Sequence, residues 1–446
     1  MASLWESIAR SDGSAAGSLH ARGASVALAS LANHSALHGK LESYRGRSVV
    51  LATHDQLPSA IALVELDGIA RRVVLCTPDL TAEAVAGVAA TAEADVMLKD
   101  EIAQPPVPCR PDRRSSEVTE WILLTSGTTG LPKLVVHSFE SLAGALPRQP
   151  AATKPMVWST FYDIRRYGGL QIFLRAIMAG SHLVLSSGGE PVREFLARAG
   201  AAGVTHISGT PSHWRRALMS GDTALISPEY VRLSGEVADQ TLLDNLRTAY
   251  PDARIAHAFA STEAGVAFDV NDGLAGFPAE FVDKPGAIEM RVKDGSLWIR
   301  SARNANRYLG AAAASLTSDD GFIDTGDMVE LQAGRYYFRG RKGGIINVGG
   351  LKIYPEEVEA VINADPRVRM SLVKGRRNPI TGSVVVAEVV LADERGGADA
   401  QSTEAVKNDL LAACRLALAA HKVPAMLRFV PALEMTAAGK LVRPGA

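Results

Sequence analysis

Short apolar runs alternate with helix-forming segments along most of the chain, and this alternation is what most constrains the fold. Residues 49–53 and 72–76 are rich in β-branched residues and predict strands, while residues 57–66 between them predict a helix. Such alternation predicts a parallel sheet with helices over both of its faces. The same pattern gives helices at 81–92, 173–178, 192–199 and 241–250, and strands at 121–124, 182–185, 205–208 and 254–256.

The pattern changes twice in the second half of the chain. From about residue 284, short alternating strands at 289–292, 297–300 and 336–338 predict a small β subdomain. The tract Gly-Arg-Lys-Gly-Gly at 340–344 is flexible and basic, as tracts that join domains often are. Beyond it the order strand, helix, strand, strand, helix, strand predicts a separate α+β unit.

These changes predict an α/β fold in three parts. A large N-terminal domain of parallel α/β sheets plus the small β subdomain would occupy residues 1–340, with a hinge at 341–344. A small α+β C-terminal domain would occupy residues 345–446. A chain of 446 residues is also longer than one hydrophobic core usually organises.

Composition narrows the setting in which the protein works. The chain has 47 basic and 48 acidic residues and a formal net charge of −1, so it lacks the global basic field that attracts nucleic acid or an anionic membrane. Three separated cysteines predict neither a disulfide framework nor a zinc site. The N-terminus resembles no signal peptide, and no apolar run approaches the roughly 20 residues of a membrane span. We therefore expect a cytoplasmic protein with no nucleic-acid or membrane partner.

The loop at 124–133 carries the clearest chemical signal. It reads Leu-Thr-Ser-Gly-Thr-Thr-Gly-Leu-Pro-Lys and directly follows an apolar strand. Glycines let backbone N–H groups point into a concavity, hydroxyls add donors and Lys133 adds a charge, which together suit a polyphosphate. The spacing is not that of a Walker A loop, and a strand-to-helix turn rich in Ser and Thr is the alternative. The candidate phosphate-binding residues are Thr125, Ser126, Gly127, Thr128, Thr129, Gly130 and Lys133.

The order Ser-Gly-Thr-Thr-Gly-x-Pro-Lys is matched at every fixed position. It resembles the signature loop of the adenylate-forming superfamily, which includes acyl-CoA synthetases, non-ribosomal peptide adenylation domains and luciferases. Further segments resemble that superfamily's motifs in the expected order, so the resemblance covers about 120 to 443, while the first 110 residues agree in pattern only. The resemblance implies that the chain binds ATP and Mg²⁺ and activates a carboxylic acid as its acyl-AMP.

The pentapeptide Phe259-Ala260-Ser261-Thr262-Glu263 resembles the superfamily's Tyr-Gly-x-Thr-Glu motif. By this resemblance Phe259 would stack on adenine, Thr262 would bond the α-phosphate and Glu263 would hold Mg²⁺, roles that suit an aromatic face and a carboxylate. Phenylalanine lacks the tyrosine hydroxyl and Ala260 replaces a glycine, but the stacking face and the carboxylate remain. The neighbouring segment Ser234 to Val237 resembles a Gly-Gly-Glu-type strand that borders adenine, with one glycine missing. The further nucleotide contacts implied are Gly235, Glu236, Val237, Ala260 and Ser261.

Three later segments resemble the remaining motifs. Asp327 of Thr-Gly-Asp and Arg341 would contact the ribose, the former because a carboxylate accepts two hydrogen bonds. Gly349 and Gly350 would leave room for the pantetheine arm of coenzyme A. Lys440, about 100 residues after the hinge, would be the catalytic lysine. Gly343 stands where relatives usually carry an Asp or Lys, so bending at the hinge survives but a side-chain lock does not.

The resemblance also implies a two-step reaction. The carboxylate would attack the α-phosphate of ATP, pyrophosphate would leave, and Lys440, Thr262 and the Mg²⁺ on Glu263 would stabilise the transition state. The C-terminal domain would then rotate so that coenzyme A can take the acyl group. A free-standing carrier protein or an amine remains open as the acceptor, and a homodimer remains open. A non-catalytic nucleotide-binding regulator would need a missing catalytic group, and none of the five expected charged side chains is missing.

The acid itself is the least determined feature. Arg166 falls near the position where relatives gate the acid with an aromatic or His residue, so we expect it to contact the acid or its carboxylate; a surface arginine on a shifted loop is the alternative. Trp214 is either a pocket wall or part of the core. Small residues nearby suit a flat or bulky group, which favours an aromatic or medium-chain acid. The candidate pocket residues are Tyr162, Arg166, Gly209, Trp214 and Ala264.

Overall fold

The structure is a computed structural model. It describes residues 3–9, 17–37, 40–99, 107–108, 117–125, 132–144, 146, 156–310, 315–379, 382–392, 400–436 and 439–442. Within these ranges, no helix combines the length and the apolar character that a bilayer crossing needs.

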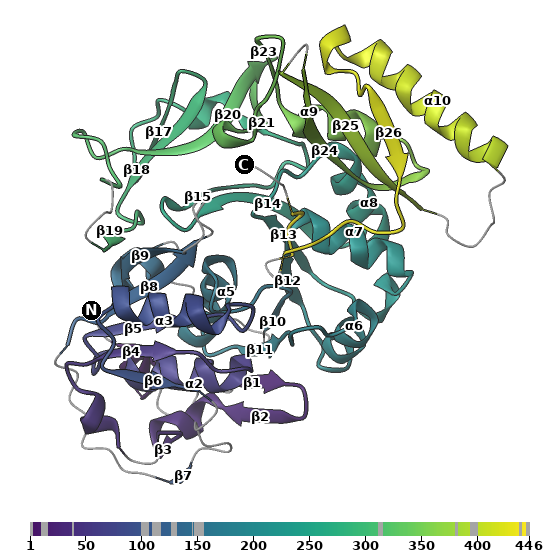
Figure 1. Cartoon of the computed structure of the whole chain (residues 1–446). Coiled ribbons are helices and arrows are strands. Elements are labelled where there is room, and N and C mark those ends of the chain that lie inside the picture. Colours follow the sequence, from purple (N-terminus) through teal and green to yellow (C-terminus); the bar gives the residue numbers. More distant parts are fainter. Residues whose placement is uncertain are drawn as a thin grey trace.

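A six-stranded sheet forms the first part of the large N-terminal region (Figure 1). Its order is β19-β9-β8-β5-β4-β6, and β8, β5, β4 and β6 are parallel. Alternate strand residues pack against α2 on one face and α3 on the other, as the sequence pattern predicts. The bounds are β4 Ser48–Leu51, α2 Gln56–Leu66, β5 Arg72–Leu75, α3 Ala82–Thr91, β6 Val96–Leu98, β8 Glu120–Thr125, β9 Lys133–Ser138 and β19 Arg307–Leu309.

The loop at 124–133 connects two antiparallel strands. β9 begins at Lys133 and pairs antiparallel with β8, so that Thr125 lies opposite Lys133. The strand-to-helix turn that we considered for this loop is therefore wrong, and the sheet is not purely parallel. The apolar run Leu-Val-Val after Lys133 explains the strand, because its two β-branched valines favour a pleated, buried surface.

An eight-stranded sheet forms the second part, with strand order β15-β14-β13-β12-β10-β11-β1-β2. Its inner strands are parallel, and only the outer pairs β14–β15 and β1–β2 are antiparallel. Helix α5 packs on one face, and α6, α7 and α8 cover the other. The bounds are β1 Ser18–Ala21, β2 Ala24–Ala27, β10 Val157–Thr160, α5 Tyr167–Met178, β11 His182–Leu185, α6 Val192–Ala201, β12 His206–Gly209, α7 Pro211–Ser220, β13 Tyr230–Ser234, α8 Gln240–Ala249, β14 Arg254–Ser261 and β15 Gly265–Val270.

A five-stranded antiparallel sheet follows, which is the predicted β subdomain. Its apolar face packs against Phe268 of β15, so it shares a core with the neighbouring sheet. The bounds are β16 Phe277–Pro278, β17 Ile288–Lys293, β18 Ser296–Ser301, β20 Ile323–Gln332 and β21 Arg335–Arg341. Short elements elsewhere in this region are α1 Leu4–Ala9, β3 His34–Ser35, β7 Val107–Pro108 and α4 Phe139–Ala143.

The C-terminal part has a hydrophobic core of its own. A single 3₁₀ turn, Lys342–Gly344, connects it to β21. The first predicted strand is a hairpin of two short strands, β22 and β23, because Gly349 and Gly350 adopt positive φ values of 57° and 85° and close a tight turn. The bounds are β22 Ile346–Val348, β23 Leu351–Ile353, α9 Pro355–Asn363, β24 Val368–Asn378, β25 Gly382–Leu391, α10 Ala400–Ala417 and β26 Met426–Phe429.

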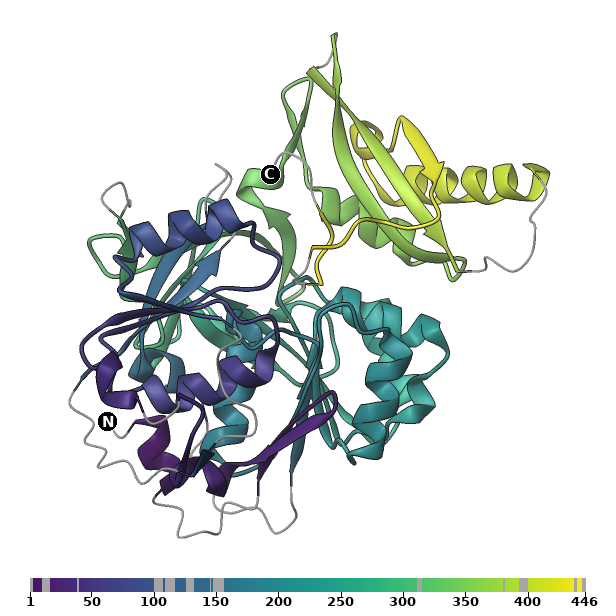
Figure 2. The same ribbon diagram turned by 60° about the horizontal axis from the view of Figure 1, so that its bottom comes forward.

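The chain after β26 returns to the large N-terminal region. Figures 1 and 2 both show this last segment, in yellow, crossing from the C-terminal sheet to the ends of β12 and β13 beside α7. The hydroxyl of Thr210 donates a hydrogen bond to the carbonyl of Gly439 at 2.8 Å. Thr210 and Gly439 are 229 residues apart in the sequence, and their hydrogen bond brings the neighbouring Lys440 to the large sheet.

Candidate active site

Most of the predicted site residues gather at the carboxyl ends of β12, β13 and β14. These strands end at Gly209, Ser234 and Ser261, directly before the segments that carry Gly235, Glu236, Val237 and the Thr262–Glu263 turn. In open α/β sheets, ligands bind at this end of the strands. Of the predicted phosphate loop, Thr125 and Lys133 lie in register on β8 and β9. Ser126, Gly127, Thr128, Thr129 and Gly130 lie outside the described residues.

Glu263 forms a small cluster with a tyrosine and a lysine. The hydroxyl of Tyr308 donates a hydrogen bond to Oε1 of Glu263 at 3.2 Å, and the ammonium of Lys133 lies 5.2 Å from the centre of the Tyr308 ring. Burial and the neighbouring Glu263 carboxylate raise the pKa of Tyr308, so its hydroxyl stays protonated and can donate. Sequence reasoning missed Tyr308, which reaches this place because β19 pairs with β9.

The donor set at Glu263 suits a Mg²⁺ ion that is shared with phosphate. No group of three acidic, His or Cys side chains that could form a metal cage occurs in the described part of the chain. Mg²⁺ characteristically binds to one or two carboxylates together with substrate phosphates and water, and a single carboxylate beside the predicted phosphate loop meets that pattern.

His137 fixes the turn that carries Thr262. Its Nε2 lies 2.7 Å from the carbonyl oxygen of Thr262, and its Nδ1 lies 2.9 Å from the hydroxyl of Ser141. The ring is fully buried, and burial lowers the pKa of His137 to about 4. A neutral imidazole with its proton on Nε2 therefore donates to the Thr262 carbonyl at neutral pH. Sequence reasoning missed this contact, which joins the strand after the phosphate loop to the Thr262–Glu263 turn.

Phe259 lies in a row of aromatic rings. Its ring is nearly parallel to that of Phe338, with centroids 5.2 Å apart, and is stacked with Phe268 at 5.8 Å. The bulge in the pairing of β14 with β15 falls between Phe259 and Ala260. The hydroxyl of Ser261 then accepts a hydrogen bond from the N–H of Ala264 at 2.9 Å, which closes the turn. The stacking of Phe259 on adenine stays a prediction.

Asp327 and Arg341 form an ion pair across two antiparallel strands. They are directly opposite in the pairing of β20 with β21, and Nε of Arg341 lies 3.1 Å from Oδ1 of Asp327. The guanidinium also donates to the carbonyl of Thr325 at 3.1 Å. Desolvation raises the pKa of Asp327, although Arg341 and Lys440 act in the opposite direction. The pair presents a carboxylate and a guanidinium at one point, which suits a group with both donors and acceptors, such as a ribose.

Lys440 meets this pair where the C-terminal segment docks. A Cβ placed on Gly235 would lie 3.3 Å from Cε of Lys440, so the lysine stem passes directly over that glycine. The Lys440 side chain remains accessible to solvent, yet the surrounding protein partly desolvates it and lowers its pKa. The carboxylates of Glu236 and Asp327 act to raise that pKa, while Arg341 and Arg166 act to lower it.

Two hydrogen bonds join the residues on either side of Lys440 to the large N-terminal region. Besides the Thr210 hydrogen bond to Gly439, the N–H of Leu441 lies 3.4 Å from Oε1 of Glu236. The second oxygen of Glu236 accepts a hydrogen bond from the N–H of Ser212 at 2.9 Å, at the start of α7. Gly439 has a φ of 68° and no room for a side chain, because a Cβ there would lie 2.0 Å from the ring of His213. The docking therefore depends on a glycine before the lysine.

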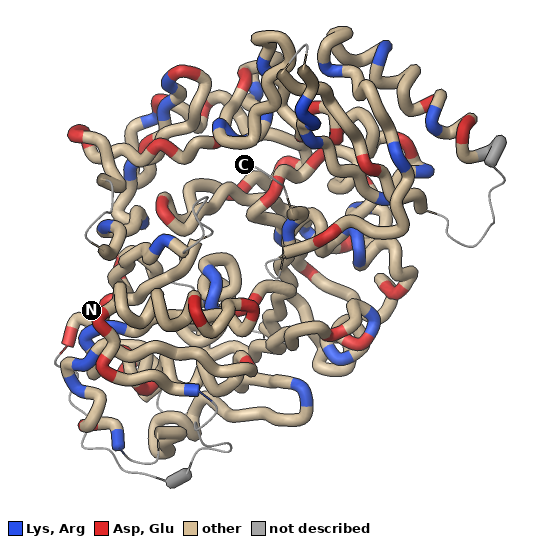
Figure 3. The backbone as a smooth tube through the Cα atoms, viewed as in Figure 1, with Lys and Arg blue, Asp and Glu red and all other residues tan. Residues whose placement is uncertain are grey.

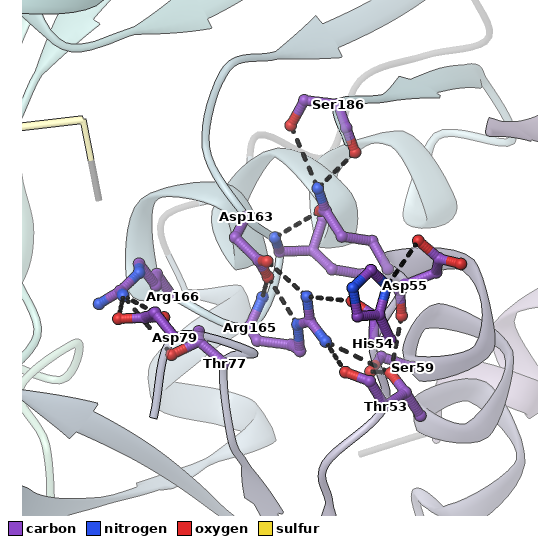
Figure 4. A network of polar contacts seen from close by, with 12 residues as sticks. Thr53, His54, Asp55, Ser59, Thr77, Asp79, Asp163, Arg165, Arg166 and Ser186 are labelled. Atoms are coloured by element: carbon purple, nitrogen blue, oxygen red, sulfur yellow. Dashed lines mark hydrogen bonds and ion pairs between the residues drawn. The ribbon is translucent and has the colours of Figure 1, made fainter. Parts of the chain in front are cut away.

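Arg166 is engaged with an aspartate rather than free. Its guanidinium lies 2.9 Å from both carboxylate oxygens of Asp79, at the N-terminus of α5 (Figure 4). The adjacent Arg165 is buried and pairs with Asp163 at 2.6 Å, so the two arginines point to different partners, as Figure 4 shows. Arg166 contributes to the electrostatic environment of Lys440, so it lies near the candidate site, and its contact with an acid substrate stays a prediction.

The other predicted pocket residues differ in their surroundings. The hydroxyl of Tyr162 is buried and donates to the carbonyl of Ser234 at 2.7 Å, beside the candidate site. Gly209 leaves no room for a side chain, because a Cβ would lie 2.7 Å from the Phe161 ring. Trp214 is fully buried in the core beneath α6, α7 and α8, as one of the two alternatives predicts. Ala264 lies in the core shared with the β subdomain.

Comparisons with known proteins give the family. A family profile described as AMP-binding enzyme matches residues 17–309, and one described as AMP-binding enzyme C-terminal domain matches residues 357–440. The chain belongs to the AMP-binding enzyme family, which confirms the superfamily indicated by the sequence motifs.

Similar proteins include acid–CoA ligases. The 2-succinylbenzoate–CoA ligase of Salmonella typhimurium is 30% identical over 300 residues, which is 64% of this chain and 61% of that ligase, so the chain spans less than two thirds of this relative's length. The o-succinylbenzoate CoA synthetase of Bacillus subtilis, solved with its acyl-adenylate, has a TM-score of 0.77 at 19% identity, covering 99% of this chain and 97% of that one. An anthranilate CoA ligase solved with anthranoyl-AMP has a TM-score of 0.82 at 17% identity, covering 99% and 95%. These structures confirm the predicted fold class.

Proposed function

We propose that the protein is an AMP-forming acid–CoA ligase. The observation that carries this proposal is that Lys440, from the returning C-terminal segment, lies over Gly235 at the carboxyl end of β13, where Asp327 and Arg341 both act on its charge. A lysine delivered by a separate part of the chain to a ribose-type site suits a reaction at the α-phosphate of a bound nucleotide. Membership of the family supports the same activity.

The acid is proposed to be aromatic. The relatives described above act on 2-succinylbenzoate or anthranilate according to their names, and both acids carry a benzene ring. We therefore infer that an aromatic carboxylic acid binds beside Tyr162, near the end of β13, with coenzyme A as the acceptor of the acyl group. 2-Succinylbenzoate is the first acid to test.

In the first half-reaction, the substrate carboxylate would attack the α-phosphate of ATP and displace pyrophosphate. Lys440 would bind the α-phosphate oxygens, where negative charge increases in the transition state, and its partial desolvation would strengthen that interaction. Thr262, on the turn fixed by His137, would bond the same phosphate. A Mg²⁺ ion on Glu263 would neutralise phosphate charge. Asp327 and Arg341 would orient the ribose, and Lys133 would hold the leaving phosphates.

In the second half-reaction, a thiol of coenzyme A would attack the acyl-AMP and release AMP. We infer that this step follows a rotation of the C-terminal domain, residues 345–446, about the hinge at 341–344. Rotation would withdraw Lys440, because its docking depends on a few contacts around Gly439. Gly349 and Gly350, at the tip of the β22–β23 hairpin, have open space where a side chain would be, and would leave room for the pantetheine arm.

Mass spectrometry of a reaction mixture tests the proposal. The purified protein would be incubated with ATP, Mg²⁺, coenzyme A and a panel of acids that includes 2-succinylbenzoate, anthranilate, benzoate and an aliphatic acid of similar size. An acyl-CoA product establishes the ligase and identifies its acid. Acyl-AMP with unchanged coenzyme A would instead support a carrier protein or an amine as the acceptor. Failure to form any adenylate with the aromatic panel, in a protein that binds ATP, would overturn the aromatic-acid assignment.

A further inference from the structure

A second polar cavity lies at the opposite ends of the same strands. Its volume is about 410 Å³, and four of its lining residues are Trp158, His206, Tyr230 and Arg254. They stand at or next to the first residues of β10, β12, β13 and β14, and the strand register places them in one row across the sheet. β13 has five residues, and Ser234 follows Tyr230 by four steps, or about 13 Å at a rise of about 3.3 Å per residue. This cavity, which we call the arginine cavity, is therefore separate from the candidate active site.

Positive charge is in excess in the arginine cavity. Arg175 of α5, Arg254 and Arg303 all line it, and among the described residues Asp269 is the one acidic residue of the lining. The carboxylate of Asp269 is already paired with the buried Arg232, whose Nε lies 2.8 Å away. No ion pair joins Arg175, Arg254 or Arg303 to an acid in the described ranges. Three arginines therefore line the cavity without an ion pair to a described carboxylate, and the guanidinium of Arg303 donates to the carbonyl of Val266 at 3.0 Å.

Two buried donors belong to residues that line the cavity. Nε of Arg175 and Nε1 of Trp158 are buried and make no hydrogen bond to the part of the chain that the structure describes, and Trp158 is only 3% exposed. The Arg175 guanidinium lies 5.4 Å from the centre of the Trp158 ring, so the two donors are neighbours. Buried polar groups normally have partners because desolvating them without a hydrogen bond is costly. Because both donor atoms are almost inaccessible, a small shift of the Arg175 or Trp158 side chain would be needed for an oxygen ligand in the cavity to bond to them.

The aromatic side chains shape the cavity but add no charge. Trp158 and His206 have ring centroids 4.6 Å apart, and the Arg254 guanidinium lies 4.5 Å from the centre of the Tyr230 ring. Burial lowers the pKa of His206, which favours its neutral form near pH 7. The charge that a ligand meets therefore comes from the arginines, which also present planar, multiply donating groups suited to a carboxylate or a phosphate.

We propose that the arginine cavity is a second binding site, which holds the carboxylate or phosphate group of a small organic anion. The buried Arg232–Asp269 pair lies between this cavity and the candidate active site on the same face of the sheet, which favours an anion separate from the acid substrate. A substrate long enough to span both ends of β13 is the other source of the same anionic group. The proposal does not depend on the ligase assignment, because it concerns binding alone.

Isothermal titration calorimetry on the purified chain tests the binding. Inorganic phosphate and succinate would be titrated separately, with ionic strength kept constant by chloride. We expect saturable binding to the natural sequence and about ten- to a hundredfold weaker binding to Arg254→Gln, because a charge-assisted contact is lost. Arg254 is solvent-exposed at the edge of the cavity, so its replacement leaves the core intact. Arg193→Gln, which removes an exposed arginine on α6 that is 77% accessible, is the matched control and should bind normally.

Steady-state kinetics identifies the source of the anion. An elongated aromatic acid with a second carboxylate would be compared with the analogue of equal length that lacks it. A rise in KM for the dicarboxylic acid alone in Arg254→Gln assigns the cavity to the far end of the substrate. Equal kinetics for both acids, together with calorimetric binding that Arg254→Gln weakens, assigns it to a separate anion. The proposal is overturned if neither phosphate nor succinate binds saturably and neither acid responds to Arg254→Gln. If the protein formed no acyl-CoA, the ligase assignment would be refuted. The calorimetric titrations would still decide whether the arginine cavity binds an anion.

Discussion

Replacing Gly439 by alanine should impair adenylate formation while sparing thioester formation. The new Cβ would lie 2.0 Å from Cε1 and Nε2 of His213, where carbon contacts of about 3.5–4.0 Å are normal. His213 cannot easily move aside, because its ring is stacked on the Phe161 ring with centroids 5.2 Å apart. The turn before Lys440 must therefore move by more than about 1 Å to restore a normal carbon contact distance. That movement breaks the 2.8 Å bond from Thr210 and displaces Lys440.

The magnitude follows from the role proposed for Lys440. A misplacement of about 1 Å in a catalytic arrangement can cost about a hundredfold in rate. We therefore expect Gly439→Ala to slow acid-dependent exchange of pyrophosphate into ATP by about a hundredfold. The conversion of supplied acyl-AMP to acyl-CoA should change less than about threefold, because that step does not use Lys440 in the docked position.

Gly221→Ala is the matched control. Gly221 also has a positive φ, 72°, at the C-terminus of α7, but open space surrounds the position of its Cβ. The control therefore carries the backbone strain of about 1 kcal/mol without the collision. Its two half-reactions should both match those of the natural sequence. An equal decrease of both half-reactions in Gly439→Ala, or adenylation within threefold of normal, would refute the proposed docking of Lys440.

Three further perturbations probe the same region. Asp327→Asn should raise the KM for ATP by about tenfold with a smaller change in kcat, because Arg341 loses its ion pair and the ribose loses a charged acceptor; unchanged ATP kinetics would exclude the ribose contact. Tyr308→Phe removes the hydrogen bond to Glu263 and should raise the Mg²⁺ concentration that gives half the maximal rate by about tenfold. A lower maximal rate with no change in that Mg²⁺ concentration would contradict Glu263 as the metal ligand. Burial lowers the pKa of His137 from the ordinary value of 6.5 to about 4 in the folded chain, so protonation of this side chain favours the unfolded state. The contribution of His137 to stability is therefore complete above pH 6.5 and is lost as the pH decreases toward 4. Urea titrations at pH 7 and pH 5 measure how much the free energy of unfolding decreases between these two pH values. We expect that decrease to be about 2 kcal/mol smaller in His137→Asn than in the natural sequence, and equal decreases would contradict a neutral buried His137.

The parts of the fold that could be predicted are those that local patterns determine. Parallel strands and their covering helices follow from apolar runs and helix propensities, and each expected element of the two large sheets overlaps one in the structure. The bounds of α5 and β14 differ from the expected ones by five or six residues, and β10, α7 and β13 were not predicted. The antiparallel β9 could not be predicted from alternation, because β8 and β9 are connected by the seven residues between Thr125 and Lys133 rather than by a crossover helix. Local propensity states that a segment is a strand but not which way it runs.

The candidate site likewise contains residues that short sequence motifs indicate and residues that only the folded structure brings in. Motif residues such as Glu263, Asp327 and Lys440 could be proposed from the sequence because short, ordered segments carry them, and their roles stay predictions. Tyr308 and His137 could not be found, because their roles arise from strand pairing and from a carbonyl contact 125 residues away. Surface charge gives no hint of either site: Figure 3 shows acidic and basic residues scattered over the whole backbone, in agreement with a net charge of −1.

Both polar sites of the large sheet have one structural cause. Parallel strands begin and end at common edges, so residues at equivalent strand positions meet even though tens of residues separate them in the sequence. At the carboxyl edge this brings together the segments that start at Gly235 and Thr262; at the amino edge it brings together Trp158, His206 and Arg254. An aromatic or basic residue at or next to the start of a single strand would not indicate a binding site. In register, such residues form a concave, positively charged surface, and the unsatisfied donors beside it are the reason to expect an anion there.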